Sequence, residues 1–207
     1  MPAKNSIKIY VENSYYHVYN RGVEKRIIFL DEHDYNTFIF YLKLYLSPHG
    51  FDKKQRIRKT FHNEITLHSF CLMPNHFHLL IHQQRATDMT EFMRALSTSY
   101  SMYFNKKYKR VGSLLQGKYK ASLVDSDNYL IALSRYIHHN PTSLFAGSDP
   151  ANYPYSSYQH FMNSVNVEWL KKDTILAYFD NNTNYLKEFF ESKEEGSLPD
   201  DLILEEE

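Results

Sequence analysis

Two histidines separated by one residue are the first candidates for chemistry in this sequence. His76 and His78 flank Phe77 in an apolar stretch, residues 76–83, that is predicted to be a β-strand. Alternation along a strand points both imidazoles to one face and Phe77 to the other. Imidazoles placed in this way can ligate one divalent ion. The alternative is a pair of histidines on the polar face of a sheet, since the chain has 11 histidines and the pattern alone is weak.

Tyr136 and Asn140 are the second candidate pair, and they lie in a predicted helix that ends at Asn140 because Pro141 disfavours helix at the residue before it. Residues four apart share a helix face, so a phenol lies beside an amide oxygen that can ligate a hard metal ion. A tyrosine hydroxyl, with a pKa of about 10, is a plausible nucleophile toward phosphorus when a nearby cation or base favours the phenolate. The alternative is a buried stripe that runs from Tyr129 through Leu133 and Tyr136, with Asn140 as a polar cap.

His138 and His139 are rival metal ligands on the same helix. They lie two and three residues from Tyr136, so they share its face less well than Asn140 does. The alternative for both is an exposed histidine at the helix end, where the helix dipole favours a cation.

The elements that must position these residues alternate between strand and helix periodicity. The predicted strands cover residues 15–19, 64–72, 76–83 and 114–124, and the predicted helices cover 32–46, about 87–107 and about 127–140. Asp31 is the predicted N-cap of the first helix. The first six elements make an α+β, ferredoxin-like antiparallel sheet with helices on one face, and the helix that carries Tyr136 is an addition to it.

The chain after this helix is predicted to be an accessory region. Residues 142–160 are rich in Ser, Pro, Tyr and Asn and indicate an irregular linker, and residues 167–192 indicate one or two short helices. We therefore expect a catalytic domain over residues 1–150 and a C-terminal helical extension with an acidic tail over 151–207.

The formal net charge of zero conceals two regions of opposite sign. Residues 188–207 hold nine acidic residues and one lysine, which leaves 23 basic against 15 acidic residues in 1–187. A basic body of this kind suits a polyanionic partner. The single cysteine, Cys71, excludes an intrachain disulfide and a zinc site made of cysteines. No apolar run approaches the roughly 18 residues of a membrane span, and the first residues lack the apolar core of a signal peptide, so a cytoplasmic protein is expected.

The candidate residues belong to a larger set of motifs. These are residues 16–22 (YHVYNRG), 28–31 (IFLD), 72–80 (LMPNHFHLL), 115–120 (LQGKYK), 124–127 (VDSD) and 135–141 (RYIHHNP), with 155–158 (YSSY) just beyond them. In this order the motifs resemble the single-tyrosine His-hydrophobic-His transposases, especially the REP-associated tyrosine transposases and the related insertion-sequence transposases. The resemblance covers about residues 14–160.

The resemblance implies a role for each candidate. His76 and His78 would be paired metal ligands, Tyr136 the nucleophile and Asn140 the third ligand, a position that is Gln in some relatives. Two imidazoles and an amide oxygen, without a thiolate, suit Mg²⁺ or Mn²⁺ held together with a phosphate, although Zn²⁺ could also occupy such a site. The implied reaction is metal-dependent cleavage and rejoining of single-stranded DNA through a 5′-phosphotyrosine. The alternatives are a catalytically silent, domesticated nucleic-acid-binding protein of the same fold and a sheet-based RNA-binding module.

The resemblance also implies partners and a location. The expected substrate is single-stranded DNA with palindromes that fold into hairpins, bound by a monomer or a homodimer in a prokaryotic cytoplasm, in association with the nucleoid. Basic side chains would contact phosphates and neighbouring aromatic rings would stack on unpaired bases, although each lysine could equally be a solvated surface charge. The candidate DNA-binding residues are Arg21, Lys106, Lys107, Arg110, Lys118 and Lys120.

Overall fold

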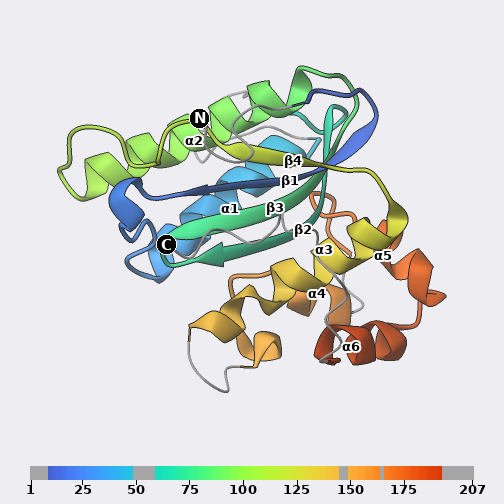
Figure 1. Cartoon of the computed structure of the whole chain (residues 1–207). Helices are drawn as coiled ribbons and strands as arrows, with labels where there is room; N and C mark the ends of the chain where they lie inside the picture. The colour runs from blue at the N-terminus through green and yellow to red at the C-terminus, as the bar shows by residue number, and fades with distance from the viewer. Residues whose placement is uncertain (1–8, 49–58, 145–148, 164–165, 193–207) are drawn as a thin grey trace.

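A four-stranded antiparallel sheet is the centre of the structure (Figure 1). The computed structural model describes residues 9–48, 59–144, 149–163 and 166–192. The strands are β1 (Ser14–Arg21), β2 (Ile65–Met73), β3 (His76–Gln83) and β4 (Lys120–Val124), in the order β2-β3-β1-β4. Helices join β1 to β2 and β3 to β4, which confirms the predicted ferredoxin-like α+β fold.

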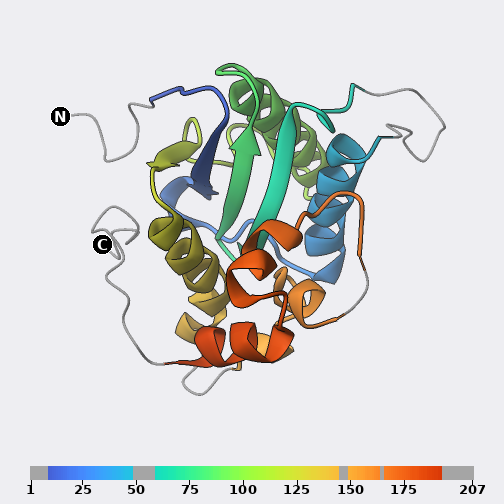
Figure 2. The same cartoon turned by 90° about the vertical axis from the view of Figure 1, so that its right-hand side faces the viewer.

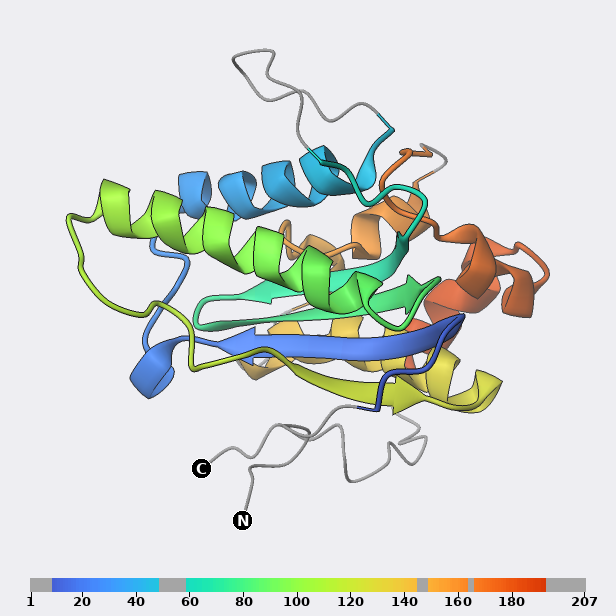
Figure 3. The same cartoon turned by 90° about the horizontal axis from the view of Figure 1, so that it is seen from above.

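Two long helices cover one face of the sheet, α1 (Glu32–Leu46) and α2 (Asp88–Lys107) (Figure 3). The carboxylate of Asp31 accepts a hydrogen bond from the backbone N–H of Asp34, so α1 begins at its predicted N-cap. The apolar stripes of both helices pack on the strand residues that point to this face, and Phe38, Phe77 and Phe92 are fully buried there. Full burial of one such side chain contributes about 1.5–3 kcal/mol.

The opposite face of the sheet is covered by α3 (Asp127–His139) and the short C-terminal helices (Figures 1 and 2). These helices are α4 (Tyr158–Met162), α5 (Asp173–Leu176) and α6 (Thr183–Glu191). The hydroxyl of Ser126 accepts the N–H of Tyr129 and caps α3. A second apolar core forms between this layer and the sheet, with Leu80, Leu133 and Phe161 at its centre. The added helix therefore lies on the sheet face that α1 and α2 leave uncovered.

Four short 3-10 turns complete the described elements: η1 (Val23–Lys25), η2 (Asn140–Ser143), η3 (Pro150–Asn152) and η4 (Ala177–Phe179). The strand predicted over 114–124 is wrong in its first half, because β4 covers Lys120–Val124 alone. Gly117 turns the chain with φ +67°, and before it only Leu115 makes an isolated bridge, with Gly22. Apolar residues at 114, 115 and 119 thus pack as parts of a loop.

Residues 155–157 pair with the outer edge of β2. The N–H of Leu72 donates to the carbonyl of Tyr155 at 2.9 Å, and the N–H of Ser157 donates to the carbonyl of Phe70 at 2.9 Å. The segment predicted as an irregular linker is therefore tied to the sheet by backbone hydrogen bonds. The division into domains at residue 150 stays a prediction, and the acidic end from residue 193 lies outside the described residues. No helix in the described ranges is long and apolar enough to cross a membrane.

Candidate active site on the α3 face of the sheet

Strand pairing assembles the candidate site on the sheet face beneath α3. β1 and β3 are antiparallel, with Tyr19 opposite His78 and Arg21 opposite His76. The intervening Phe77 is fully buried in the core of the other face. This arrangement confirms that both imidazoles of the His-x-His pair share one face, as alternation predicts.

Tyr136 and Asn140 reach this face from the C-terminal turn of α3. The ring of Tyr136 meets the imidazole of His78 edge-on, with 5.5 Å between ring centroids and 85° between ring planes. The side-chain N–H of Asn140 donates to the carbonyl of Tyr136 at 3.0 Å. Asn140 thus caps the helix through its Nδ2, while its amide also lies close enough to His76 and His78 to affect their pKa values.

His17 is a member of this cluster that sequence reasoning missed. Its Nε2 lies 2.8 Å from Nδ1 of His78, and the two rings stack with 5.0 Å between centroids. The His17 ring also meets the edge of Tyr136 at 6.0 Å and stacks on Tyr19 at 4.8 Å. Alternation along β1 places His17 on the same face as Tyr15 and Tyr19, but its partner depends on the register between β1 and β3, which the sequence does not contain.

Burial keeps these imidazoles neutral at neutral pH. It lowers the pKa of His17 to about 3 and the pKa of His76 to about 4. Burial, followed by the neighbouring His76 and His17, holds the pKa of His78 well below its usual value. The Asn140 amide opposes these shifts at His76 and His78, and the Arg21 charge adds to the shift at His76. A neutral imidazole keeps the lone pair that a metal ion requires.

The donor atoms of the cluster fit a divalent ion. Nδ1 of His76 lies 2.6 Å from the side-chain oxygen of Asn75, which leaves its Nε2 for a ligand. Nε2 of His78 is buried and has no hydrogen-bond partner among the described residues. Asn140 can add its amide oxygen, because its Nδ2 is the atom that bonds to Tyr136. No group of three or more His, Cys, Asp or Glu in the described ranges is arranged for a metal ion, so a two-histidine site with an amide is the candidate that the geometry offers.

Comparison with known proteins assigns the chain to a family. Residues 10–140 match the family model of IS200-like transposases, which is more than half of the chain. The chain belongs to the IS200-like transposase family. Both the His-x-His pair and Tyr136 lie within the matched region of this transposase.

The fold of this transposase is also found in a solved structure. The structure of a REP-associated tyrosine transposase bound to a REP hairpin matches with a TM-score of 0.56 and 11% identity, covering 74% of this chain and 82% of that chain. A candidate transposase from Deinococcus radiodurans R1 matches with a TM-score of 0.41 and 17% identity, covering 65% of this chain and 95% of that chain. No curated protein sequence matches the transposase.

The histidines next to Tyr136 face away from the candidate site of the transposase. His138 is fully buried, its Nε2 lies 2.6 Å from the hydroxyl of Ser157, and its ring packs against Phe161. Nε2 of His139 bonds to the carbonyl oxygen of Phe190. The alternative of two exposed histidines at the helix end is therefore wrong for His138, and His139 is half-buried, because the C-terminal helices cover the end of α3. Burial lowers the pKa of His138 to about 3.

Arg21 and Lys120 lie at the edge of the transposase site, and Lys118 is in the loop that leads to Lys120. Nε of Arg21 donates to Gln116 at 2.5 Å, and Gln116 belongs to the loop that leads into β4. The ammonium of Lys120 lies 6.0 Å from the centroid of the Tyr19 ring, and Lys118 is exposed. Gly22, next to Arg21, admits no side chain, because a Cβ there would lie 2.1 Å from the carbonyl oxygen of Arg26.

The other predicted DNA-binding residues lie at the end of α2. Lys106 lines an open groove of about 550 Å³ between α2 and the loop 112–117. Lys107 instead forms ion pairs with Asp31 and Asp34, each at 2.7 Å, and Arg110 donates to the side chain of Asn105 at 3.1 Å. The charge of Lys107 is therefore engaged by two carboxylates on the α1–α2 side of the sheet.

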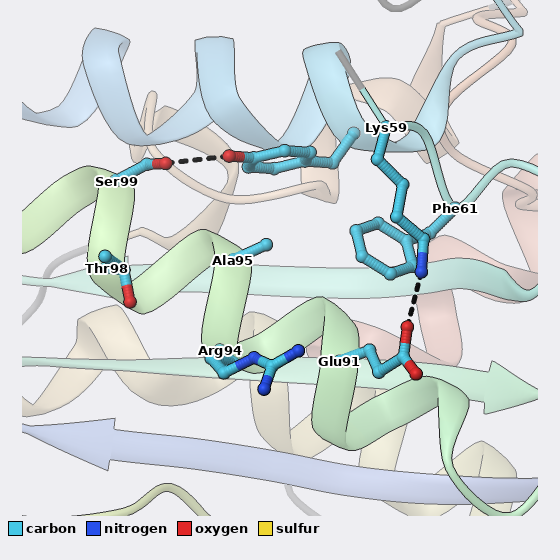
Figure 4. A pocket seen from close by; sticks show the side chains of 8 residues that line it. Lys59, Phe61, Glu91, Arg94, Ala95, Thr98 and Ser99 are labelled. Carbon is cyan, nitrogen blue, oxygen red and sulfur yellow. Dashed lines mark hydrogen bonds and ion pairs between the residues drawn. The ribbon is translucent and has the colours of Figure 1, made fainter.

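A separate hollow of about 450 Å³ lies between α1 and α2, on the face opposite the histidines (Figure 4). Lys59 pairs with Glu91 across it, and the hydroxyl of Tyr45 lies 2.7 Å from that of Ser99. Lys59 is the one described member of the basic stretch at residues 53–59, and the rest of that stretch lies outside the described residues. Lys59 and Glu91 neutralise each other, and Arg94 adds one positive charge to the lining of this hollow.

Proposed function

We propose that this transposase cleaves and rejoins single-stranded DNA through a covalent bond between Tyr136 and a 5′-phosphate. The observation that carries the proposal is the contact between Tyr136 and His78, at 5.5 Å between ring centroids, with His76 and Asn140 beside them. A nucleophile and a set of metal-donor atoms from separate elements thus meet at one point. All of them belong to one chain, which supports cleavage by a single subunit.

The metal that we propose is Mg²⁺ or Mn²⁺. Nε2 of His76, Nε2 of His78 and the amide oxygen of Asn140 would hold it, leaving open positions for oxygens of the substrate. When bound, such an ion neutralises charge that develops on the scissile phosphate. The fit rests on the buried Nε2 of His78, which lacks a hydrogen-bond partner among the described residues, and on the neutral state of both imidazoles.

The covalent step uses the phenol of Tyr136. Its oxygen attacks the phosphorus as the phenolic proton leaves to solvent, and the bond from phosphorus to the 3′ oxygen breaks. The leaving oxygen takes up a proton and becomes a free 3′-OH. A 3′-OH can then attack the phosphotyrosine and restore a phosphodiester, with the tyrosine as leaving group. Because one phosphoester replaces another, rejoining needs no external energy source.

DNA is the proposed partner for two reasons. The chain belongs to a transposase family, and a solved structure with a similar fold shows a transposase bound to a REP hairpin. We propose hairpin-forming single-stranded DNA as the substrate class for this chain as well. Arg21 and Lys120 lie at the edge of the Tyr136 site, and we propose that they and the nearby exposed Lys118 contact the phosphates that flank the scissile bond.

Metal-dependent nicking tests this proposal against a silent DNA-binding protein of the same fold. Purified protein is incubated with a labelled single-stranded hairpin and Mg²⁺ or Mn²⁺, and the products are separated on a denaturing gel. We expect cleavage with a free 3′-OH, abolished by a chelator and restored by added metal. Binding of the hairpin without cleavage under any of these metal conditions would favour the silent protein.

A further inference from the structure

We infer that His17 is a positioning residue that fixes the orientation and tautomer of His78 for metal binding. This inference rests on the proposed function, because it concerns the ion that His76, His78 and Asn140 would hold. His17 is the fully buried side chain whose ring nitrogen lies 2.8 Å from Nδ1 of His78.

The position of His17 follows from the sheet. His17 lies on the central strand β1, where Leu80 is its partner on β3, so His78 is its diagonal neighbour on the same face. The two imidazoles are nearly parallel, with 15° between ring planes. The ring of Tyr19 stacks on both imidazoles, with its centroid 4.8 Å from that of His17 and 5.9 Å from that of His78. Both rings are thus restrained by packing as well as by the bond between them.

A single proton lies between the two nitrogens, and its owner decides whether His78 can bind a metal. If Nδ1–H of His78 donates to Nε2 of His17, Nε2 of His78 keeps its lone pair. In the reverse arrangement, Nε2 of His78 carries a proton and cannot ligate. Metal-binding histidines commonly donate their other N–H to a neighbouring acceptor, which orients the ring and raises its basicity. Here the acceptor is another imidazole.

In the metal-binding arrangement Nδ1 of His17 carries a hydrogen, and this nitrogen has no partner among the described residues. Ser122 is the partner of His17 in the pairing of β1 with β4, and its hydroxyl oxygen is also buried without a partner in the described ranges. Paired residues lie on one face of a sheet, but no hydrogen bond joins Ser122 to His17 in this structure, so the restraint on the His17 ring comes from His78 and from stacking on Tyr19.

The test compares two substitutions that differ in their ability to accept a hydrogen bond. His17→Leu fills much of the site but offers no acceptor, whereas His17→Gln can place an amide oxygen near the position of Nε2. We expect His17→Leu to weaken Mn²⁺ binding by about 10–100-fold in calorimetric titration. The Mn²⁺ concentration for half-maximal nicking should rise by a similar factor, while the rate at saturating Mn²⁺ changes little. His17→Gln should recover most of the affinity.

His82→Leu is the matched control, because His82 lies on the same face of β3 and is half-buried away from the cluster, with its Nε2 bonded to Asn13. Unchanged Mn²⁺ affinity in folded His17→Leu, or equal losses in the Leu and Gln variants, would overturn the inference. If neither variant folds, ¹⁵N spectra of the wild-type imidazoles decide, since a proton on Nε2 of His78 would also overturn it. Wild-type protein that neither binds Mn²⁺ nor nicks DNA would instead overturn the proposed function.

Discussion

The ring of Tyr136 lies edge-on to the imidazole of His78, although the two residues belong to a helix and a strand that are separated by β4 and α2 in sequence. The apolar contacts of Leu133 and Ile137 with the sheet hold α3 in this position. The hydrogen bond that the Asn140 side chain donates to the Tyr136 carbonyl then fixes the last turn of the helix over the histidines. Packing of one amphipathic helix therefore determines which tyrosine meets the His-x-His pair.

Removal of His76 should abolish metal binding without unfolding the protein. His76 is the first residue of β3 and half-buried, so His76→Ala leaves little empty space in the core. We expect loss of Mn²⁺ binding in calorimetric titration, loss of nicking, and a melting temperature within a few degrees of wild type. Asn140→Ala should give an equal or smaller loss. His33→Ala, an exposed histidine on α1, is the control. Retained cleavage in His76→Ala and in the presence of chelator would exclude the metal site.

Lys107 should stabilise the fold in a pH-dependent manner. Hydrogen bonds from Lys107 lower the pKa of Asp31. At Asp34 burial acts to raise the pKa, but hydrogen bonds from Lys107, Tyr108 and the backbone outweigh it and the net shift is downward. Carboxylates with depressed pKa values stabilise the folded state above their unfolded pKa of about 3.9, and this stabilisation is lost as pH falls through the folded values.

We therefore expect Lys107→Met to lower the free energy of unfolding by about 2–4 kcal/mol at pH 7, because it leaves the fully buried Asp34 without its cation. The difference from wild type should shrink below about pH 4 as the carboxylates become protonated. Urea unfolding at several pH values measures this. Lys106→Met, on the exposed side of α2, is the control and should have little effect. A Lys107→Met effect that is independent of pH would contradict this account of the ion pairs.

Basic residues at the edge of the site should determine the salt dependence of DNA binding. For single strands the slope of log affinity against log salt changes by about 0.7 for each phosphate contact. We expect Lys120→Ala and Lys118→Ala each to reduce the slope by up to this amount in fluorescence titrations with a single-stranded hairpin. Lys59→Ala should leave the slope unchanged, since Lys59 pairs with Glu91 on the opposite face. Equal effects of all three substitutions would indicate that binding follows net charge and not this surface.

Local patterns in the sequence predict most of the fold. The helix over 32–46 is confirmed with its Asp31 cap, because helix periodicity and capping are properties of neighbouring residues. The strand at 114–119 is wrong because apolar residues there contact the core from a loop that turns at Gly117. The sequence indicates that these residues are buried, but it does not show whether a strand or a loop carries them.

In the candidate site, too, relations between neighbouring residues are predictable from the sequence and contacts between distant residues are not. The shared face of His76 and His78 follows from alternation, and the neighbourhood of Tyr136 and Asn140 follows from helix spacing. The contact between His17 and His78 depends on strand register, and the ion pair of Lys107 with Asp34 depends on how α1 packs against α2. Both relations join residues more than 60 positions apart, and a pattern of nearby residues does not contain them.

Identification of the covalently bound residue tests the central claim most directly. Wild type, Tyr136→Phe and Tyr129→Phe are incubated with a labelled single-stranded hairpin and Mn²⁺, and any adduct that survives detergent is mapped by mass spectrometry. Phe at position 136 keeps the ring contact with His78 and removes only the attacking oxygen. We expect an adduct on Tyr136 in wild type and in Tyr129→Phe, and neither adduct nor nick in Tyr136→Phe, which should still bind DNA and Mn²⁺. An adduct in Tyr136→Phe, or one that maps to another residue in wild type, would contradict the assignment.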